Sequence, residues 1–425
     1  MPRVVVVGGG FSGCGAAIAA AKAGAEVTLL ERTDMLLGVA SRAGETNGNG
    51  WFVARHELRL MGGGDLFQML DSIKLHENVH FPDGGGQSYI YHAGLAEPGL
   101  RKVVEKVGVK VRYESRVIDV EKKGGRVLSI KIEDGSRVAG DSFVDCTGTR
   151  GGLSFCIKYG QGCVLCLVKC VAFGDRLGLA ERAGARMVNL HRPDGTIGQL
   201  GAGICMFKDT LAPWLKQRIE KEGLVKLPMP PHLIDRTKLK LMGAGRSRDF
   251  IENVILGDIG PVAKGFGMVY MHLEKLRQIP GFENVEMENP MYSRFNHVGF
   301  VTMAVRDNSL RMEGFENLLA GGEKAGNGSV DGAIVSGYVA GHNAARIASG
   351  HEPVVLPRQV AIGDWIAFVK EKHSSEDGLV KTYPMSRGDY WERMQKAGLY
   401  TENVPEIEQR MKTAGIEGLF SRAVS

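Results

Sequence analysis

Residues 4–13 read VVVVGGGFSG, a run of valines that leads directly into a cluster of glycines. Four consecutive β-branched residues predict a strand that is buried on both faces within a parallel sheet. The alanine-rich stretch 14–23 predicts a helix, and residues 26–30 predict a second strand. This order of strand, glycine-rich turn, helix and strand is typical of a Rossmann-type dinucleotide-binding unit.

The residues of this turn have separate expected roles. Gly8 allows the tight turn, Gly10 lets the backbone approach a pyrophosphate, and Gly13 lets the helix pack closely on the strand. The helix N-terminus offers free amide groups and the positive end of a dipole to the phosphates. Glu31 follows the second strand, where a carboxylate accepts hydrogen bonds from both ribose hydroxyls. A carboxylate at this place argues against a 2′-phosphate, and so against NADP.

Three later segments resemble the FAD-binding elements of large flavoprotein families. Residues 35–42, MLLGVASR, resemble a loop that covers the FAD phosphates and flavin ring, and residues 143–149, FVDCTGT, resemble a strand end of two-dinucleotide flavoproteins. Residues 317–323, NLLAGGE, read as a buried strand that ends in glycines and an acid, and 331–346 as a long helix. The resemblance implies that the acid lies on the ribityl–pyrophosphate region. It also implies that the helix points its N-terminus at the flavin N1–C2=O edge, where its dipole stabilises the reduced flavin.

Together these segments predict that the cofactor is FAD. A plain strand–helix unit without a ligand is the alternative interpretation of the segment 317–346. A second dinucleotide module is not predicted, because residues 243–247, GAGRS, lack a third glycine and a following helix. The residues expected to bind FAD are Gly8, Gly10, Phe11, Ser12, Gly13, Glu31, Arg32, Gly38, Arg42, Val117, Thr147, Gly148, Gly322, Glu323, Gly328, Ser329 and Ala333.

The rest of the pattern divides the chain into parts. A helix is expected over 95–107, a strand over 109–113, and a meander of strands over 116–121, 126–133 and 136–139. We expect an α/β fold: a glutathione-reductase-like FAD-binding (Rossmann-type) domain with an inserted α+β substrate domain. The expected boundaries are 1–155 for the first part of the FAD-binding domain, with an inserted loop region at about 43–94, then 156–305 for the substrate domain, 306–350 for the second FAD part and 351–425 for a helical C-terminal extension.

Composition sets the broad class of protein. The 425 residues include 44% hydrophobic residues and carry a net charge of +5, which permits an RNA or another anionic partner without requiring one. We expect no membrane span and no secretory signal, because neither an 18-residue apolar run nor a signal-like start occurs. The odd count of seven cysteines favours a reducing compartment, so a cytoplasmic protein, expected to be a homo-oligomer, is predicted.

Five cysteines crowd one stretch and leave three interpretations open. They can be small apolar residues of a buried strand, because 163–173 reads CVLCLVKCVAF. They can act as thiols beside the flavin, by disulfide exchange or as a covalent nucleophile. They can also hold an iron–sulfur cluster, although the spacing matches no ferredoxin run. The weak catalytic candidates are therefore Cys163, Cys166 and Cys170, which follow Cys146 and Cys156, together with Arg42.

Histidines give no metal-ligand spacing apart from His76 and His80, four residues apart. Their segment also holds Asn78 and Pro82, so we interpret it as a solvated loop. No metal is predicted. Arg42, Glu45, Asn47 and Asn49 occupy a glycine-rich stretch that is expected, by its position, to meet the flavin or the substrate.

Residues 265–297 resemble a stretch of the folate- and FAD-dependent tRNA uracil methyltransferases and of the related tRNA wobble-uridine modifying flavoproteins. Glu274, Arg277 and the run 279–286, IPGFENVE, carry this resemblance, and residues 361–367 and 383–385 resemble C-terminal pieces of the same family. The resemblance implies FAD and this fold. The methyltransferases place a cysteine nucleophile soon after the first nucleotide-binding unit, whereas residues 41–70 hold no cysteine here, and Cys205 is a loose candidate for their second cysteine.

Three functions follow as hypotheses. The first is an FAD-dependent oxidoreductase that passes a hydride or electrons between FAD and a small organic or protein-bound substrate. The second is a group-transfer enzyme that carries a methylene from a folate to an RNA uracil, which needs a cysteine nucleophile and a basic surface. The third is a flavin-containing electron carrier that depends on a partner protein.

Overall fold

The structure is a computed structural model of the whole chain. It describes residues 1–82, 85–148, 177–189, 199–201, 203–236, 248–268, 271–288, 298–300, 302–326, 328–374 and 382–424. The predicted candidates Cys156, Cys163, Cys166 and Cys170, and the stretch 243–247, lie outside these residues.

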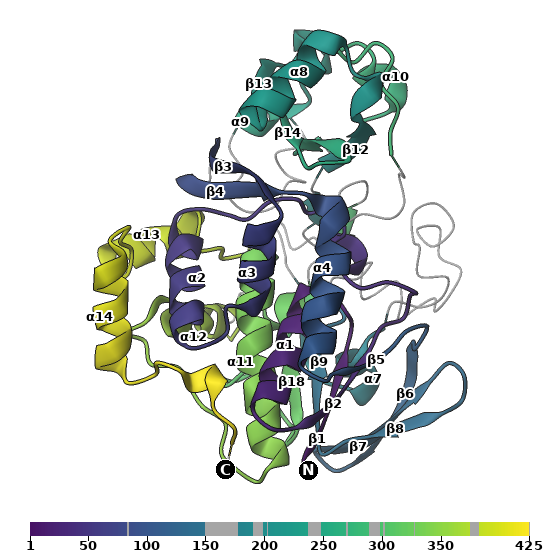
Figure 1. The fold of residues 1–425 in the computed structure, drawn as a ribbon. Coiled ribbons are helices and arrows are strands. Elements are labelled where there is room, and N and C mark those ends of the chain that lie inside the picture. The colour runs from purple at the N-terminus through teal and green to yellow at the C-terminus, as the bar shows by residue number, and fades with distance from the viewer. Residues whose placement is uncertain are drawn as a thin grey trace.

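A five-stranded parallel sheet forms the base of the molecule (Figure 1). The four valines of β1 are buried, as a strand covered on both faces requires. The strand order β18-β9-β1-β2-β5 brings segments from both ends of the chain into one sheet. Its strands are β1 (Arg3–Val7), β2 (Glu26–Leu30), β5 (Lys110–Arg112), β9 (Ser142–Asp145) and β18 (Leu318–Ala320). The predicted α/β fold with a parallel Rossmann-type sheet is confirmed.

Two helices cover one face of this sheet and lie against each other over most of their length. They are α1 (Phe11–Lys22) and α11 (Val330–Ala348). A side chain at Gly337 would overlap the backbone oxygen of Ser12, and one at Gly341 would overlap that of Ala16. The contact therefore needs glycine, because only a residue without Cβ lets two helix backbones approach this closely.

Other predicted elements of the FAD domain are present with small shifts at their ends. The expected meander is the antiparallel sheet β6-β7-β8, and the helix expected over 95–107 is α4. The bounds are β6 (Val117–Lys123), β7 (Arg126–Ile132), β8 (Arg137–Ala139) and α4 (Ala93–Lys106).

The prediction of a loop region at about 43–94 was wrong for most of its length. That segment forms the helices α2 (Gly50–Leu60) and α3 (Asp65–Ser72) and the hairpin of β3 (Lys74–Phe81) and β4 (Gly85–Tyr91). Trp51, Ala54 and Leu58 give α2 a buried apolar face. His76 and His80 consequently lie on a strand, and the ring of His76 approaches Asp258 with Nε2 3.3 Å from Oδ2.

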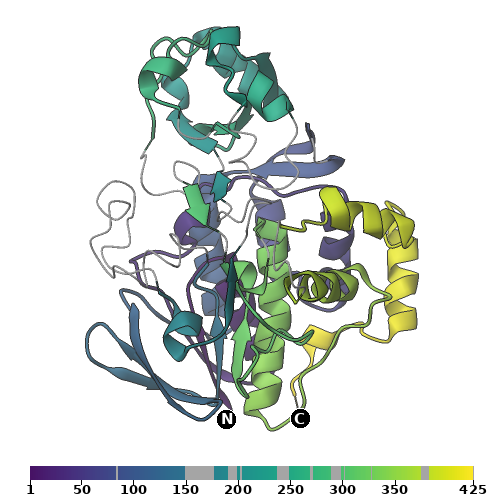
Figure 2. The same ribbon diagram turned by 180° about the vertical axis from the view of Figure 1, so that it is seen from behind.

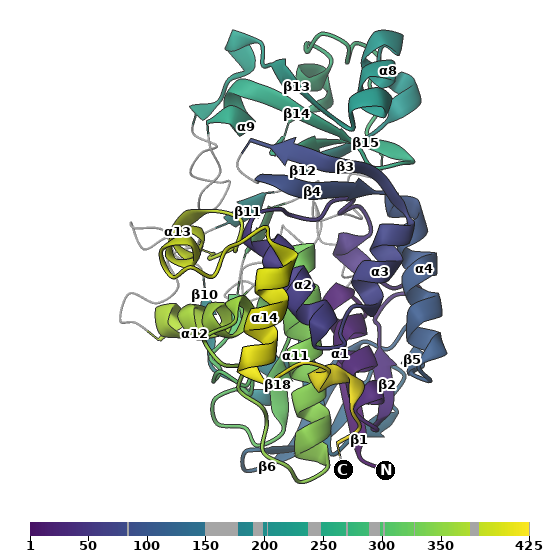
Figure 3. The same ribbon diagram turned by 60° about the vertical axis from the view of Figure 1, so that its left-hand side comes forward.

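A second, smaller body lies beyond the hairpin (Figures 1 and 3). Its antiparallel sheet has the order β12-β15-β14-β13, and its core includes Ile204, Leu215 and Val254. It lies within the stretch 156–305, for which the sequence predicts an inserted α+β domain, and it is called the substrate domain here; its role in substrate binding stays a prediction. Its elements are β12 (Gly203–Phe207), α8 (Pro213–Glu222), β13 (Leu224–Pro228), α9 (Asp249–Glu252), β14 (Asn253–Asp258), β15 (Val262–Phe266) and α10 (Leu273–Leu276).

The C-terminal part is helical and packs beside α2 and α11 (Figure 2). It consists of α12 (Ala361–His373), α13 (Gly388–Lys396) and α14 (Val404–Ala414). Glu57 of α2 is fully buried and fastens this part, because its carboxylate accepts hydrogen bonds from the N–H groups of Ala361 and Ile362 at 2.8 and 3.0 Å. In the part of the chain that the structure describes, no helix is both long and apolar enough to span a membrane.

Glu57→Ala is expected to lower the free energy of unfolding by about 3 kcal/mol, because it leaves two helix N–H groups and the Arg410 guanidinium without their buried carboxylate. Urea denaturation followed by circular dichroism measures this change. Glu408→Ala, at an exposed position of α14, is the matched control and should change stability by less than about 0.5 kcal/mol. Equal effects of the two substitutions would contradict the capping role.

Candidate functional site

The glycine-rich turn forms an uncapped helix start at the carboxyl edge of the sheet. Gly8 has φ of +101°, and a side chain there would meet the Cys146 carbonyl oxygen at 2.5 Å. A side chain at Gly13 would overlap the Gly8 oxygen, whereas the space beside Gly10 is open. No side chain caps α1 and no acidic residue lies in its first turn, so its N–H groups and its dipole are available to an anion.

Glu31 lies beside this turn and is 5% exposed. Its Oε2 accepts from the Gly9 N–H at 2.7 Å, and its Oε1 accepts from the N–H and the hydroxyl of Thr33 at 2.9 and 3.0 Å. A carboxylate has about four acceptor positions, so Oε2 retains capacity for a ribose hydroxyl. Turn and carboxylate therefore fit a dinucleotide with its pyrophosphate on α1.

Two distant segments meet the same turn. The Ser12 hydroxyl donates to Cys146 Sγ at 3.3 Å, and a side chain at Gly322 would meet Ser12 Cβ at 2.9 Å. Gly148, with φ of +73°, lies so that a Cβ would be 3.7 Å from Glu323 Oε2. The segments 143–148 and 321–323, which the sequence analysis singled out, therefore converge with the first glycine turn.

The helix α11 extends past the start of α1. The two helices run parallel, because Gly337 faces Ser12 and Gly341 faces Ala16. Gly337 comes seven residues after Val330, the first residue of α11. At 1.5 Å per residue, the N-terminus of α11 lies about 10 Å beyond that of α1. A molecule with its pyrophosphate on α1 can therefore extend toward the N-terminus of α11, where the Ser329 hydroxyl accepts from the Gly332 N–H and Ala333 lies in the first turn.

The segment 36–49 runs between these two helix N-termini. It begins on the glycine turn, because the Leu37 N–H donates to the Gly9 oxygen at 2.9 Å. Leu37 and Asn49 both have positive φ, +70° and +53°, and Gly38 begins a short 3-10 helix between them. Backbone of this kind costs energy outside glycine, so the surrounding contacts must hold it.

Residues 44–46 pair with β4 through an isolated antiparallel bridge between Glu45 and Ile90. Tyr91 N–H donates to the Gly44 oxygen at 2.9 Å, and Thr46 N–H donates to the Tyr89 oxygen at 3.0 Å. The aromatic rings of Tyr89 and Tyr91 are buried, so this edge of the segment is covered by side chains from β4.

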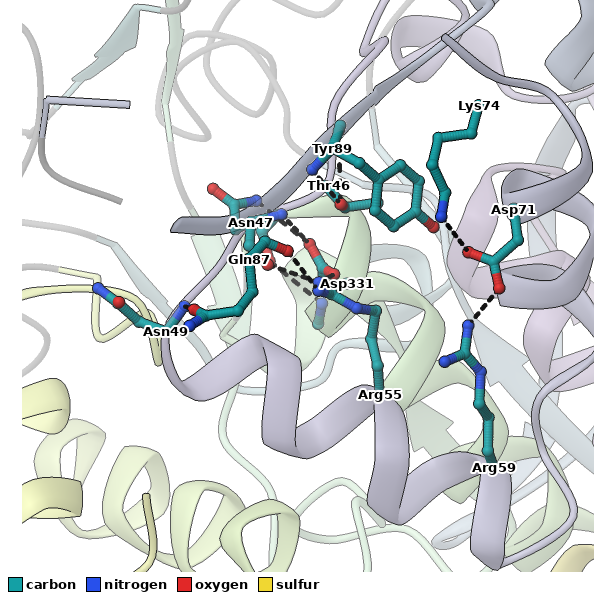
Figure 4. A network of polar contacts seen from close by, with 12 residues as sticks. Thr46, Asn47, Asn49, Arg55, Arg59, Asp71, Lys74, Gln87, Tyr89 and Asp331 are labelled. Carbon is teal, nitrogen blue, oxygen red and sulfur yellow. Dashed lines mark hydrogen bonds and ion pairs between the residues drawn. The ribbon is translucent and has the colours of Figure 1, made fainter. Parts of the chain in front are cut away.

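A buried polar network holds the far end of this segment on α11 (Figure 4). Asp331, in the first turn of α11, is fully buried and pairs with Arg55 of α2 at 2.7 Å. The same carboxylate accepts from the N–H and the side-chain amide of Asn47 at 2.9 and 3.2 Å. Arg55 also donates to the backbone oxygens of Asn47 and Gln87 at 2.5 and 2.9 Å.

Two ion pairs join this segment to the substrate domain. Arg42 donates to both carboxylate oxygens of Glu288 at 2.7–2.9 Å. Lys264 of β15 is fully buried; its ammonium group lies 2.6 Å from Glu45 Oε2 and 2.5 Å from the Ala43 oxygen. Arg42 and Glu45 therefore each link the segment 36–49 to the substrate domain.

The structure gives the positions of four further residues that are predicted to bind the cofactor. Arg32 follows β2 and is exposed, Gly328 is exposed just before α11, and Val117 is buried at the start of β6. Thr147 is turned toward its own strand, because its hydroxyl donates to Asp145 at 2.6 Å.

The described cysteines are Cys14, Cys146 and Cys205, and all three are buried. Burial raises the pKa of Cys146 and of Cys205 to about 12, and that of Cys14 well above its ordinary value. Lys264 and Arg42 act in the opposite direction on Cys205 but are outweighed. These three groups are therefore thiols at neutral pH rather than nucleophilic thiolates.

Sequence reasoning missed several residues that build this site. Arg55 and Lys264 lie in segments whose pattern indicates no buried charge, and Glu288 gives no motif at all. Asp331 was identified only as the expected start of a helix. Their partners are far away in sequence, 276 residues for Arg55 and Asp331 and 246 for Arg42 and Glu288, so no local pattern could have paired them.

Comparisons with known proteins agree with this geometry. A family model described as FAD dependent oxidoreductase matches residues 3–153, and one described as Glucose inhibited division protein A matches residues 263–352. The methylenetetrahydrofolate–tRNA-(uracil-5-)-methyltransferase TrmFO of Lysinibacillus sphaericus is 34% identical over 103 residues, which are 24% of this chain and 23% of that protein. The FAD-dependent monooxygenase ntnJ of Nectria sp is 28% identical over 154 residues, 35% of this chain and 36% of the relative. Among solved structures, GidA of Aquifex aeolicus has a TM-score of 0.67 at 17% identity, covering 97% of this chain and 78% of that chain.

The fold, the dinucleotide site and these matches define the chain as an FAD-binding flavoprotein whose residues 3–153 are similar to FAD-dependent oxidoreductases. Within that class it has the fold of GidA, and part of its sequence is similar to tRNA uracil methyltransferases named TrmFO. The matched segments span only 23% and 36% of the two curated relatives' own lengths.

Glu31→Ala is expected to weaken FAD binding at least tenfold, because one charge-assisted hydrogen bond contributes about 1.5–3 kcal/mol. Titration of the apoprotein with FAD, followed by quenching of flavin fluorescence, measures the dissociation constant. Glu26→Ala, at the exposed start of β2, is the control and should bind FAD like the unmodified protein. Unchanged affinity in Glu31→Ala would place the ribose elsewhere.

Proposed function

We propose that this chain is an FAD-dependent oxidoreductase that transfers a hydride or electrons between bound FAD and a small organic or protein-bound substrate. The observation that carries the proposal is the convergence of the glycine turn, Glu31 and the N-terminus of α11 on one extended site. FAD supplies the redox chemistry at this site, and the chain binds and orients it.

The residues of the chain have distinct proposed roles. The N-terminus of α1 holds the pyrophosphate, and Glu31 holds the ribose of the adenosine half. The N-terminus of α11 would hold the pyrimidine edge of the flavin, and its dipole would favour negative charge there. The segment 36–49, which runs between the two helix N-termini, would cover the flavin, and its links through Arg42 and Lys264 would hold the substrate domain beside it.

Group transfer to RNA is the second candidate, and the similarity to the TrmFO proteins favours it. That reaction needs a thiolate nucleophile. The described cysteines, Cys14, Cys146 and Cys205, are buried, and burial raises their pKa values, so none of these three is suited to act as that thiolate.

The purified protein is expected to bind FAD and to lose the absorbance band of oxidised flavin when NADH or NADPH is added without oxygen, because a direct oxidoreductase accepts hydride from a small donor. Anaerobic absorbance spectra measure this. Bleaching that occurs only with a partner protein would instead identify an electron carrier. A protein that binds no flavin even after incubation with FAD would contradict the proposed function.

Cys205→Ala separates the two candidate functions. Under the redox proposal it should leave the rate of flavin reduction within about twofold, because the buried thiol takes no part in hydride transfer. Stopped-flow absorbance measures that rate, and methyl transfer to unmodified tRNA in the presence of methylenetetrahydrofolate measures the alternative. Methyl transfer by the unmodified protein that is lost in Cys205→Ala would favour the second candidate.

A further inference from the structure

The N-terminus of α11 carries a charge that works against its proposed role. A helix N-terminus stabilises negative charge, such as that of a reduced flavin. Asp331 places a fully buried carboxylate in the first turn of this same helix. A carboxylate there, taken alone, would oppose the accumulation of a second negative charge close by.

Arg55 balances this carboxylate. The two side chains are 5% and 0% exposed and meet at 2.7 Å, so little water screens the pair. The ring of Tyr89 covers the guanidinium, with 5.6 Å from its carbon to the ring centroid. Arg55 comes from α2, so the balance depends on how α2 and the segment 36–49 are docked on α11.

The same pair fixes the segment that lies against the flavin. Asp331 accepts from Asn47 and Arg55 donates to the Asn47 oxygen, so both partners of the ion pair hold one residue of the segment. The network in Figure 4 therefore combines two tasks, which are charge balance at the flavin edge and attachment of the segment. Only the first task depends on the sign of the charge that a substitution removes.

We propose that the Arg55–Asp331 ion pair sets the reduction potential of the flavin by neutralising the first turn of α11. This inference rests on the proposed function, which places the flavin pyrimidine edge at that helix N-terminus. Removal of Asp331 leaves a buried positive charge and makes the bound flavin easier to reduce. Removal of Arg55 leaves a buried negative charge and makes it harder to reduce.

The test measures the ratio of reduced to oxidised flavin in the FAD-loaded protein, at equilibrium with a reference dye and without oxygen. Asp331→Asn is expected to raise this ratio about tenfold, and Arg55→Gln to lower it about tenfold. Each tenfold change corresponds to about 30 mV for a two-electron couple. Arg55→Lys keeps the charge without the fork of donors and should stay close to the unmodified protein. Asp331→Asn combined with Arg55→Gln should also return near the original ratio.

Arg59→Met is the matched control. Arg59 lies one turn further along α2 and pairs with Asp71 at 2.5 Å, but the two side chains are 33% and 36% exposed. Water screens such a pair, so its loss should change the ratio less than threefold. If Arg55→Gln does not fold, the ratio of reduced to oxidised flavin is compared between Asp331→Asn and Arg59→Met. A ratio in Asp331→Asn that is no higher than in Arg59→Met then overturns the inference.

A structural role alone would loosen the segment in both single variants and shift their ratios in the same direction. The inference is overturned if the ratio of reduced to oxidised flavin in Asp331→Asn is less than ten times the ratio in Arg55→Gln, or if Arg55→Gln has the higher ratio. Either result leaves the proposed function intact as long as the unmodified protein binds and reduces its flavin. A protein that binds no flavin would instead remove the proposed function.

Discussion

The close approach of α1 and α11 is the constraint on which the site depends. At Gly337 and Gly341 the backbone of α11 lies so near that of α1 that no side chain fits between them. Because this contact fixes the two helices parallel and in one register, it also fixes the distance between their N-termini. Under the proposed function, one N-terminus serves the pyrophosphate and the other the flavin, and the offset of about 10 Å between them follows from the helix packing.

The segment 36–49 gains its conformation from three neighbours. The glycine turn holds its start, the edge of β4 holds residues 44–46, and the ion pair of Arg55 and Asp331 holds Asn47. The substrate domain adds the links to Arg42 and Glu45. A segment with two positive-φ residues outside glycine persists only when its surroundings determine it in this way. Its geometry is therefore a shared product of the FAD domain, the hairpin and the substrate domain.

The parts that could be predicted from sequence are those whose causes are local. The valine strand, the glycine turn and the meander follow from periodicity and turn chemistry, and the parallel sheet follows from their order. The prediction of a loop at about 43–94 was wrong because the buried surface of α2 is not purely apolar. This helix buries Arg55 and Glu57 beside its hydrophobic residues. A charged residue in a short helix is read as exposed unless its partner is known. The partners here, Asp331 and the N-terminus of α12, come from the other end of the chain.

Buried charges occur where distant segments of this chain meet. Lys264 joins the substrate domain to Ala43 and Glu45, and the fully buried Lys324 pairs with Glu181. Arg306 donates to the oxygens of Ile366 and Ala325, and burial lowers its pKa to about 9. Apolar residues of similar volume would stabilise such contacts about as strongly, because the desolvation penalty of a buried ion pair offsets much of its Coulomb energy. Buried charges additionally require one relative position of the two segments, because a shift of one segment leaves a buried ion without its partner. Around the proposed flavin position, the charges that align the segments are also those that set the local potential, so docking and redox tuning cannot vary independently in this fold.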